Sequence, residues 1–504
     1  VAVGLRAGPR AGARELGPVT NGRALARAGL IVTAAFLVSR VLGWVRMAVI
    51  GITFGATGEL DAFFAAFRIP DLIFQLVAAG ALSSALIPIV AGLVANHEEA
   101  RAWRAVATVT NLMLGLLLVL AVVVALAAPA IIPAITPGFD LVASARTVEL
   151  TRIMLLSPVL LALGSVATSV LNAGGRFAAS AVAPIVYNLV IIGAAVFLAP
   201  VLGVEGLAVG VVAGSLAHLA VQLRPLFRTG FTYEPIVDLS DPDARRALVL
   251  MAPRAVGLGV SQLTFLVMTS LASVLAVGSI TAFNLAFTLL QIPIGVIGVP
   301  LGVVVFPSLA REVASGSPAG YVRLLTLALR LLAFVMLPIT ALAIVLRRQV
   351  VTLLFGYGRF DDPAIALTAN TLLFFLVGLT AHALIGVLAR AFYARQDTRT
   401  PVAAAVLAVA VNVAFGLATV GWLGLAGLAL GIALGAWVEA GMLVAVLRRQ
   451  VPGLELAGLA RVLLEAGVAS VAAGAAALGT VYLIDSLIGP DPSKLALLFQ
   501  VVVA

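Results

Sequence analysis

Residues 39–91 read SRVLGWVRMAVIGITFGATGELDAFFAAFRIPDLIFQLVAAGALSSALIPIVA, and this stretch decides the class of fold. It is apolar enough for two membrane-spanning helices, yet ionisable side chains interrupt it, among them Arg40, Arg46, Asp61, Arg68 and Asp71. An ionisable side chain at membrane depth costs at least about 2.5–3.5 kcal/mol. These side chains are therefore not expected to face lipid, and the stretch predicts two helices that line a polar or charged cavity.

The composition of the whole chain agrees with that prediction. Hydrophobic residues make up 62% of the 504 positions and charged residues 11%, whereas soluble domains are about 45–50% apolar and about 25% charged. The apolar runs are long and do not alternate with polar residues, which predicts spanning helices rather than the strands of a β-barrel. The sequence contains no cysteine, so disulfides, thiol catalysis and thiolate metal sites are excluded.

Apolar runs bounded by charged residues, glycine or proline predict an all-α integral membrane protein with about fourteen transmembrane helices. The predicted helices cover residues 28–53, 59–95, 105–128, 147–171, 178–199, 204–225, 245–276, 279–311, 322–346, 363–393, 399–419, 422–447, 458–484 and 494 onward. The last run is too short to cross a membrane, so we expect the sequence to be truncated at its C-terminus.

The placement of basic residues predicts the orientation. Most arginines in the predicted loops fall on the side of the N-terminal tail, and loops rich in basic residues stay in the cytoplasm. We therefore expect a multi-pass protein whose N-terminus is cytoplasmic. The arginines are dispersed rather than grouped with aromatic side chains, so nucleic-acid binding is not expected.

The two halves of the chain resemble each other. The string GLAVGVVAG at 206–214 returns as GLALGIALG at 427–435, and Arg-Ile-Pro at 68–70 is echoed by Gln-Ile-Pro at 291–293. These offsets correspond to six helices, an even number, which predicts a parallel repeat of two six-helix lobes. The predicted organisation is a basic tail over 1–27, a first lobe over 28–226, a linker over 227–244, a second lobe over 245–447 and two extra C-terminal helices over 458–504.

Polar residues form a stripe on each of two equivalent helices, 59–95 and 279–311. The stripes consist of Asp61, Arg68, Asp71 and Gln75 on the first helix and Asn284, Thr288 and Gln291, followed by glycines, on the second. One interpretation is that the stripes face each other across a cavity. The alternative is that Asp61 and Asp71 form internal ion pairs with Arg68 and that the glycines only pack helices.

Three further arginines complete the candidate site. Arg40 and Arg46 lie on the first predicted helix, where a bend at Gly43 would bring their side chains together. Arg254 lies near the cytoplasmic end of the seventh helix, where it either faces the cavity or extends to the membrane surface. The guanidinium of arginine forms forked, charge-assisted hydrogen bonds with the oxygens of an anion.

The sequence lacks the residues that an enzyme or a metal site would need. His97, His218 and His382 are isolated and do not have the spacing of metal ligands. The sequence contains no nucleotide-binding loop, no nucleophile with a base and no acidic cluster for Mg²⁺. We therefore expect a transporter with no cofactor and no metal site, driven by a coupling cation or by the membrane potential.

Several strings together carry a family resemblance. SRVLGWVR, DAFFAAFRIPDL and AGALSSALIPIVA are followed later by QIPIGVIGVPLGVVVFPSLARE, LLFGYGRFD and FYARQDTRTPV. This combination resembles the MurJ/MviN family of lipid II flippases. The resemblance implies the V-shaped, two-lobe fold of the multidrug/oligosaccharidyl-lipid/polysaccharide exporter superfamily, in the bacterial cytoplasmic membrane. It also implies alternating access that carries an undecaprenyl-diphosphate-linked disaccharide-pentapeptide to the outer leaflet.

The resemblance implies that Arg40, Arg46, Asp61 and Arg68 contact the diphosphate or the headgroup. This chain also departs from the family pattern: Met47 replaces a common aspartate, Phe74-Gln75 replaces a double arginine, and Thr288 replaces a cavity arginine. The seventh and eleventh predicted helices contain no acidic residue, so a family-type sodium site is not supported.

The function expected from sequence is therefore the flipping of lipid II. The rival transport functions are the flipping of another polyprenyl-linked oligosaccharide and drug/cation antiport, although antiport would call for twelve helices and acidic cavity residues. A polyprenyl-dependent transferase and a non-transporting scaffold for cell-wall enzymes are rivals of other classes. Expected partners are the lipid substrate, membrane lipids and cell-wall synthesis proteins.

Overall fold

The computed structural model describes residues 22–77, 81–451, 453, 456–488, 497 and 500–501, and every regular element among them is helical. The first half contains α1 (Gly22–Phe54), α2 (Gly58–Val77), α3 (Ala81–Ala95), α4 (Glu99–Ile135), α5 (Leu141–Met154), α6 (Leu156–Ala173), α7 (Phe177–Gly193), η1 (Ala194–Leu198) and α8 (Ala199–Phe227). The rest contains α9 (Pro242–Ser273), α10 (Ser279–Pro293), η2 (Ile294–Gly298), α11 (Val299–Ala314), α12 (Pro318–Val345), α13 (Arg347–Phe355), α14 (Asp362–Leu376), α15 (Leu379–Ala394), α16 (Arg399–Leu423), α17 (Leu425–Gln450) and α18 (Leu456–Ile488).

Each predicted helix from 28–53 to 458–484 has a helical counterpart, although several of them are broken. The predicted helix 59–95 corresponds to α2 and α3, between which residues 78–80 lie outside the described residues, and 363–393 is divided into α14 and α15. The short helix α13 was not predicted, because its nine residues are too few to form a spanning run. Helix α1 begins earlier than predicted, and residues 1–21 and most of the segment from 494 onward lie outside the described residues.

The chain is an all-helical, multi-pass membrane protein. Nine of the described helices are long and apolar enough to cross a membrane, or ten if α14 and α15, which meet at a 46° bend, count as one span. This count takes residues 177–227 as a single helix. Gly203 breaks that stretch with φ 64° and ψ −146°, so the segments predicted at 178–199 and 204–225 meet at a kink.

Proline explains the two π-helical turns. The π turn η1 directly precedes Pro200, and η2 precedes Pro300. Proline has no N–H to donate, and its ring clashes with the carbonyl one turn earlier, so the helix widens locally before it. The turn η2 lies in the middle of the predicted helix 279–311, and this helix bears one of the two polar stripes.

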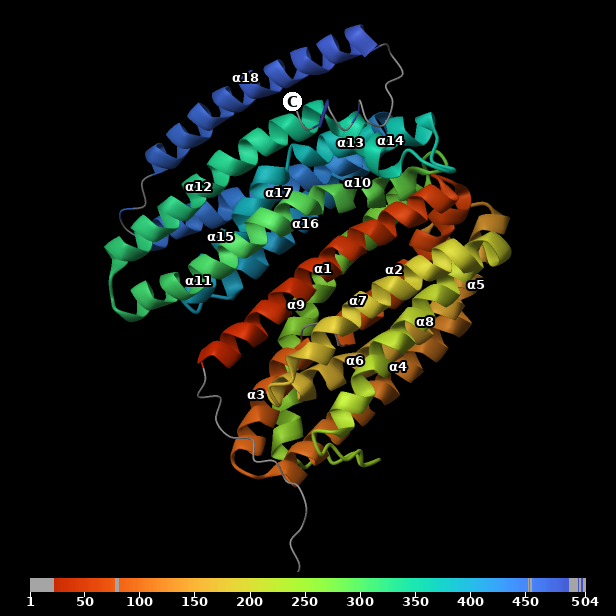
Figure 1. Ribbon diagram of the computed structural model, residues 1–504, viewed down its shortest axis with the longest axis vertical. Helices are drawn as coiled ribbons and strands as arrows, with labels where there is room; N and C mark the ends of the chain where they lie inside the picture. Colours follow the sequence, from red (N-terminus) through yellow and green to blue (C-terminus); the bar gives the residue numbers. More distant parts are fainter. Residues whose placement is uncertain are drawn as a thin grey trace, which may run out of the picture.

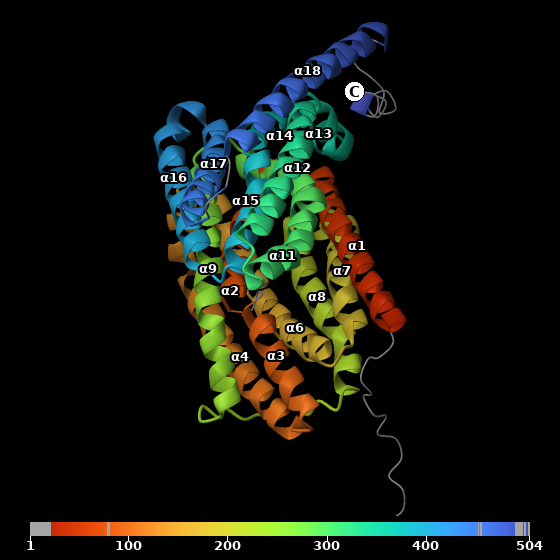
Figure 2. The ribbon, with the colours of Figure 1, turned by 90° about the vertical axis from the view of Figure 1, so that its left-hand side faces the viewer.

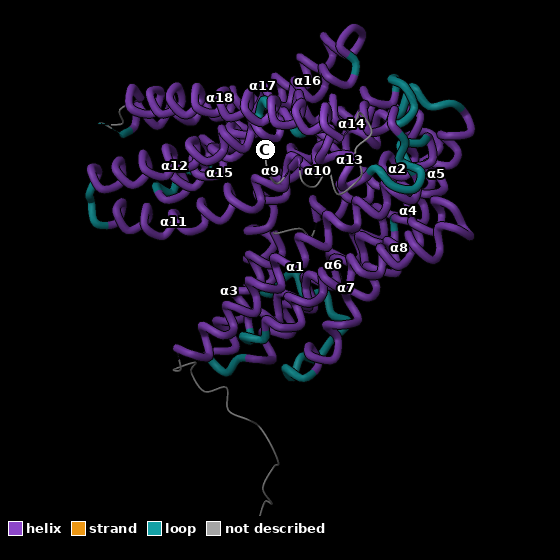
Figure 3. Tube along the Cα trace, turned by 45° about the horizontal axis from the view of Figure 1, so that its top comes forward, coloured by secondary structure: helices purple, strands orange, loops and turns teal. Residues whose placement is uncertain are grey.

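The helices form two arms that diverge from one end of the molecule. Figure 3 shows α11, α12, α15 and α18 in one arm and α1, α3, α6 and α7 in the other, with α2, α5, α13 and α14 near the end where the arms meet. Helix α18 packs along α12 on the outside of its arm (Figures 1 and 2).

Helix α9 contacts both arms. It packs against α2, α3 and α4 of the first half and against α10, α16 and α17 of the second. The sequence analysis placed this segment in the second lobe, and that division into lobes stays a prediction. We call α9 the shared helix, because its contacts reach both halves of the chain.

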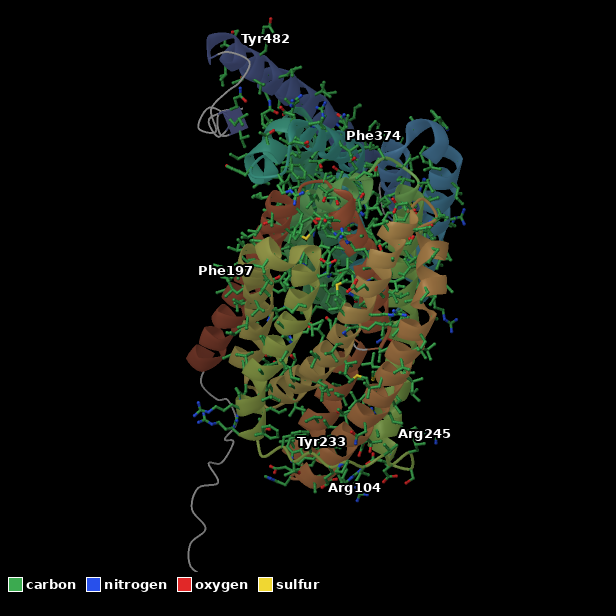
Figure 4. All side chains as sticks on the ribbon, turned by 90° about the vertical axis from the view of Figure 1, so that its right-hand side faces the viewer. Arg104, Phe197, Tyr233, Arg245, Phe374 and Tyr482 are labelled. Atoms are coloured by element: carbon green, nitrogen blue, oxygen red, sulfur yellow. The ribbon has the colours of Figure 1, made fainter. Side chains whose placement is uncertain are left out.

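The linker before α9 is attached to the first half. The side chain of Asn111 on α4 donates to the carbonyls of Glu234 (3.2 Å) and Ile236 (2.9 Å) and accepts from the Tyr233 hydroxyl (2.6 Å). Hydrogen bonds from Ser240 hold the pKa of Asp238 below its ordinary value. Figure 4 shows Arg104, Tyr233 and Arg245 together at this end of the molecule, which is the end predicted to be cytoplasmic.

Candidate functional site: an arginine-lined cavity between the arms

A cavity of about 420 Å³ lies where α1 and α7 face α10. Its lining includes Phe36, Ser39, Arg40, Trp44, Arg46, Tyr187, Asn188 and Thr288. A smaller recess of about 130 Å³ adjoins it and shares Arg46, Met47 and Tyr187. Arg68 and Asn284 line the recess together with apolar side chains that include Phe63, Phe64 and Phe67. The structure therefore brings Arg40, Arg46, Arg68, Asn284 and Thr288 to one place.

Arg40 is exposed and lines the larger cavity. Its guanidinium carbon lies 5.3 Å from the ring centroid of Phe36, one turn earlier on α1. A Cβ atom added at Gly295 would lie 3.4 Å from Nη1 of Arg40. The glycine stripe of the second polar helix therefore leaves room for this guanidinium.

Arg46 lies between the two parts of the cavity and also rests on an aromatic ring. Its guanidinium carbon is 5.7 Å from the ring centroid of Tyr187 on α7. A cation over the face of an aromatic ring is attracted by the ring's electrons and keeps its charge. Tyr187 was not among the predicted site residues, because a single tyrosine in an apolar helix carries no signal of its own.

Arg68 on α2 is bound by neutral groups. Its Nε donates to the Thr269 hydroxyl (3.0 Å), and its Nη2 donates to the amide oxygen of Asn284. The guanidinium carbon lies 5.2 Å from the ring centroid of Phe265. Thr269 and Phe265, both on α9, were missed by the sequence analysis.

Asp61 lies outside the cavity, at the end where the arms meet. Its carboxylate accepts from the backbone N–H of Gly278 (2.7 Å), the backbone N–H of Thr281 (2.7 Å) and the Thr281 hydroxyl (2.6 Å). Gly278 precedes α10 at φ 89° and has no side chain to cap that helix. Asp61 therefore supplies from α2 the anionic cap that the N-terminus of α10 lacks.

Near Asp61, backbone segments from different parts of the chain lie close together. We call this region the outer junction; it consists of Ile52, Ala56, Asp61, Gly278, Gly358 and Arg359. The N–H of Arg359 donates to the carbonyl of Ile52 (2.9 Å), and Gly358 lies so close to the same carbonyl that a Cβ atom would overlap it. Gly278 lies equally close to the Ala56 carbonyl. The junction joins the end of α1 to the start of α10 and to the loop after α13.

The remaining predicted residues occupy other places. Asp71 accepts from the side-chain amide of Gln262 on α9 (3.0 Å), and Gln75 follows one turn later on α2. Neither residue lines the two parts of the cavity described above, and Gln291 does not line them either. Arg254 lies on α9, but its side chain is outside the described residues.

Internal ion pairs at the cavity were the alternative interpretation of the polar stripe. Among the described side chains, no carboxylate lies within 4.0 Å of the guanidinium of Arg40, Arg46 or Arg68. The three cations are instead held by aromatic rings, hydroxyl or amide groups. The Asp71 carboxylate interacts electrostatically with Arg68 and Arg46 from beyond ion-pair distance. Three guanidinium groups against this one carboxylate leave a net positive charge at the cavity, which attracts an anion.

Comparison with known proteins agrees with this architecture. The family model described as "Lipid II flippase MurJ" matches residues 50–488. The chain is 33% identical to the lipid II flippase MurJ of Burkholderia cenocepacia, covering 84% of each chain, and 30% identical to the probable lipid II flippase MurJ of Vibrio cholerae, covering 84% of this chain and 83% of that one.

Solved structures show the same fold. A structure titled "Lipid II flippase MurJ, inward closed conformation" matches with a TM-score of 0.78 at 20% identity, covering 94% of this chain and 96% of that chain. An inward-facing multidrug resistance MATE family transporter of the MOP superfamily matches with a TM-score of 0.69 at 18% identity, covering 84% and 98%. The fold is therefore that of a MOP-superfamily transporter rather than of an enzyme, and the chain belongs to the lipid II flippase MurJ family.

Proposed function

We propose that this protein flips lipid II, the undecaprenyl-diphosphate-linked peptidoglycan precursor, from the inner to the outer leaflet. The observation that carries the proposal is the convergence of Arg40, Arg46 and Arg68 on one cavity with no carboxylate partner within ion-pair distance among the described side chains. A diphosphate offers these guanidinium groups charge-assisted hydrogen bonds that their present aromatic and neutral partners cannot match.

The proposed topology is that of the sequence analysis. We infer about fourteen spans, two six-helix lobes in a V and two additional C-terminal helices, with the N-terminus in the cytoplasm of a bacterial cell. The arms diverge at the end that carries Arg104, Tyr233 and Arg245 (Figure 4). In this orientation the present state is open to the cytoplasm and is closed at the outer junction.

The proposed cycle follows from this state. The headgroup enters from the inner leaflet and its diphosphate binds the arginines. The outer junction then parts while the arms close at the cytoplasmic end, and the headgroup leaves toward the outer leaflet. Either the membrane potential or a cation gradient drives the return of the empty protein.

The first experiment is complementation of a strain depleted of its lipid II flippase. The wild-type chain should rescue growth, and the variants Arg40→Ala, Arg46→Ala and Arg68→Ala should each lose rescue at equal membrane levels. Arg461→Ala is the matched control, because Arg461 is an exposed arginine that pairs with Glu465 on its own helix. Full rescue by all three cavity variants would refute the assigned site.

A second candidate function is the flipping of another polyprenyl-diphosphate-linked oligosaccharide. The observation that favours it is the uncharged wall formed by Asn284 and Thr288 on α10, opposite the arginines. A purified protein in vesicles should be offered lipid II and a polyprenyl-diphosphate glycan without the peptide. Faster flipping of the peptide-free glycan would select this second function.

A further inference from the structure

The partners of Arg68 come from helices other than its own. Arg68 lies on α2, whereas Phe265 and Thr269 lie on the shared helix α9 and Asn284 lies on α10. The guanidinium therefore links the first arm to the second inside the cavity. Because Arg68 also lines the recess beside Arg46, the same group that links the arms is available to an anion in the cavity.

Asn284 is fixed in the orientation that receives Arg68. Its side-chain N–H donates to the carbonyl of Ile280 one turn earlier (2.7 Å), which turns the amide oxygen toward Arg68. Thr269 is only 2% exposed, so its hydroxyl has little access to solvent. Asn284 is therefore placed in advance by its own helix, and Thr269 receives Arg68 in a buried position.

A second link lies on the same face of α2. Asp61 and Arg68 are two turns apart, and Asp61 caps the start of α10 while Arg68 binds Asn284 further along it. The two links hold α2 and α10 along a common line, which we call the α2–α10 seam. The Asp61 end of the seam belongs to the outer junction.

We propose that Asn284 and Thr269 are positioning residues that hold Arg68 as a releasable link, which an anionic diphosphate headgroup displaces to open the outer junction. The identity of the headgroup rests on the proposed function, whereas the link itself does not. The bonds from Arg68 to Asn284 and Thr269 have a charge on the donor only. A diphosphate adds the opposite charge and two oxygens that fit the guanidinium fork, so it outcompetes the amide and the hydroxyl.

Displacement of Arg68 from Asn284 opens the outer junction because the headgroup binds more tightly when the α2–α10 seam is parted. A ligand shifts a conformational equilibrium only by its difference in affinity for the two states. With the seam closed, the headgroup must break the bonds from Arg68 to Asn284 and Thr269. With the seam parted, it binds Arg68 without that competition. Binding therefore favours the parted state, and release of the headgroup lets Arg68 return to Asn284 and close the seam.

The absence of cysteine from the sequence makes the link directly measurable. A Cβ atom at Gly58 would lie 3.6 Å from Cγ1 of Val277 across the outer junction. The pair Gly58→Cys with Val277→Cys in the full chain should therefore form a disulfide rapidly when the junction is closed. The rate of disulfide formation in substrate-free vesicles reports the closed fraction.

Two substitutions at Asn284 should move that rate in opposite directions. Asn284→Ala removes the acceptor of Arg68 and should lower the rate about tenfold, as expected for one hydrogen bond to a charged group. Asn284→Asp keeps the shape and adds a carboxylate for Arg68, so it should raise the rate. Thr398→Asp, which adds the same charge at an exposed position outside the cavity, is the control and should not raise it. The proposal would be overturned if both Asn284 variants changed the rate of disulfide formation in the same direction, or if neither changed it.

Lipid II tests the ligand separately. Added to vesicles of the cysteine pair, lipid II should slow disulfide formation, and undecaprenyl monophosphate, which carries less charge, should slow it less. In the Asn284→Asp variant lipid II should have little effect, because the carboxylate retains Arg68. An equal response in that variant would overturn displacement. If the two Asn284 variants change the rate of disulfide formation in opposite directions while lipid II leaves that rate unchanged, the result would support the link and refute the proposed substrate.

Discussion

The cavity arginines show how a membrane protein keeps cations between its helices without pairing each with a carboxylate. Arg40, Arg46 and Arg68 each lie over an aromatic ring, which belongs to Phe36, Tyr187 and Phe265 respectively. A salt bridge would hold an arginine more firmly but would cancel the charge that an anionic substrate needs. The aromatic face lowers the cost of the charge without using the N–H groups in the guanidinium plane, which at Arg68 bind the neutral groups of Thr269 and Asn284 instead of a carboxylate.

Tyr187 provides a test of this arrangement at the level of one residue. Tyr187→Leu removes the ring beneath Arg46 and should reduce lipid II flipping about fivefold, the equivalent of about 1 kcal/mol of cation–π attraction. The reduction should appear mainly as a higher KM, because Arg46 would be less well placed to bind. The measurement is the flipping rate in vesicles as a function of lipid II content.

Tyr187→Phe separates the ring from its hydroxyl. It keeps the aromatic face and should flip lipid II at close to the wild-type rate. Tyr482→Leu, on an exposed part of α18, controls for the loss of a tyrosine elsewhere. A loss in Tyr187→Phe as large as in Tyr187→Leu would contradict the role assigned to the ring.

At this scale the sequence predicted the charged residues better than their surroundings. The cost of intramembrane charge singled out Arg40, Arg46 and Arg68, and the structure places all three at the cavity. Helical spacing placed Asp61 on the face of Arg68 but could not show that it lies at the outer junction. Phe265 and Thr269 were missed because apolar and hydroxyl side chains are common in spanning helices.

At the scale of elements, the outer junction depends on glycine where backbone meets backbone. Gly358 has φ 57° and lies against the carbonyl of Ile52, beside the hydrogen bond from Arg359 to the same carbonyl. Only glycine combines this conformation with this closeness, because a Cβ atom would be strained and would also collide. The loop after α13 can therefore pack against the end of α1 in this way only if residue 358 is glycine.

Gly358→Ala should part the outer junction. The left-handed conformation alone costs an alanine about 1–2 kcal/mol, and the collision with Ile52 adds to that cost only when the junction is closed. Disulfide formation between cysteines at 58 and 277 should therefore slow by about fivefold or more. Gly175→Ala is the matched control, because Gly175 also has positive φ but a Cβ atom added there would meet nothing within 4 Å. Equal slowing in both variants would assign the effect to strain rather than to the junction.

The elements themselves were largely predictable, and their breaks were not. Long apolar runs identified the segments that became α1, α4, α12 and α18. The 46° bend between α14 and α15 leaves no clear mark in the apolar run at 363–393. The π turns follow from Pro200 and Pro300, but proline also occurs within unbroken helices such as α4, so its presence alone does not predict a π turn.

At the scale of the whole molecule, the internal repeat gave the two arms but not the helix they share. The repeat assigned α9 to the second lobe, because sequence similarity records ancestry rather than packing. In the structure the linker is bound to α4 through Asn111, and α9 packs on α2, α3 and α4 before it reaches the second arm. The all-helical membrane fold was thus predicted, whereas the contacts of α9 with both halves were not, and the division into two six-helix lobes stays a prediction.

The proposed orientation can be tested with single cysteines in the otherwise cysteine-free chain. Leu239→Cys in the linker and Val277→Cys before α10 are exposed positions at opposite ends of the molecule. A thiol reagent that cannot cross membranes should label the cysteine at 277 in intact cells and the cysteine at 239 only after permeabilisation. Labelling of 239 in intact cells would reverse the proposed topology.

The neutral partners of Arg68 have a consequence for the environments this protein tolerates. Among the described residues, the ion pairs nearest the outer junction, those of Arg146 and Arg348, stay within a single arm. The contacts that join the arms there are hydrogen bonds to amide, hydroxyl and backbone groups, which dissolved ions screen little when they are buried. The closed conformation of the outer junction should therefore change little when the salt concentration outside the cell rises, for example from that of fresh water to that of brine.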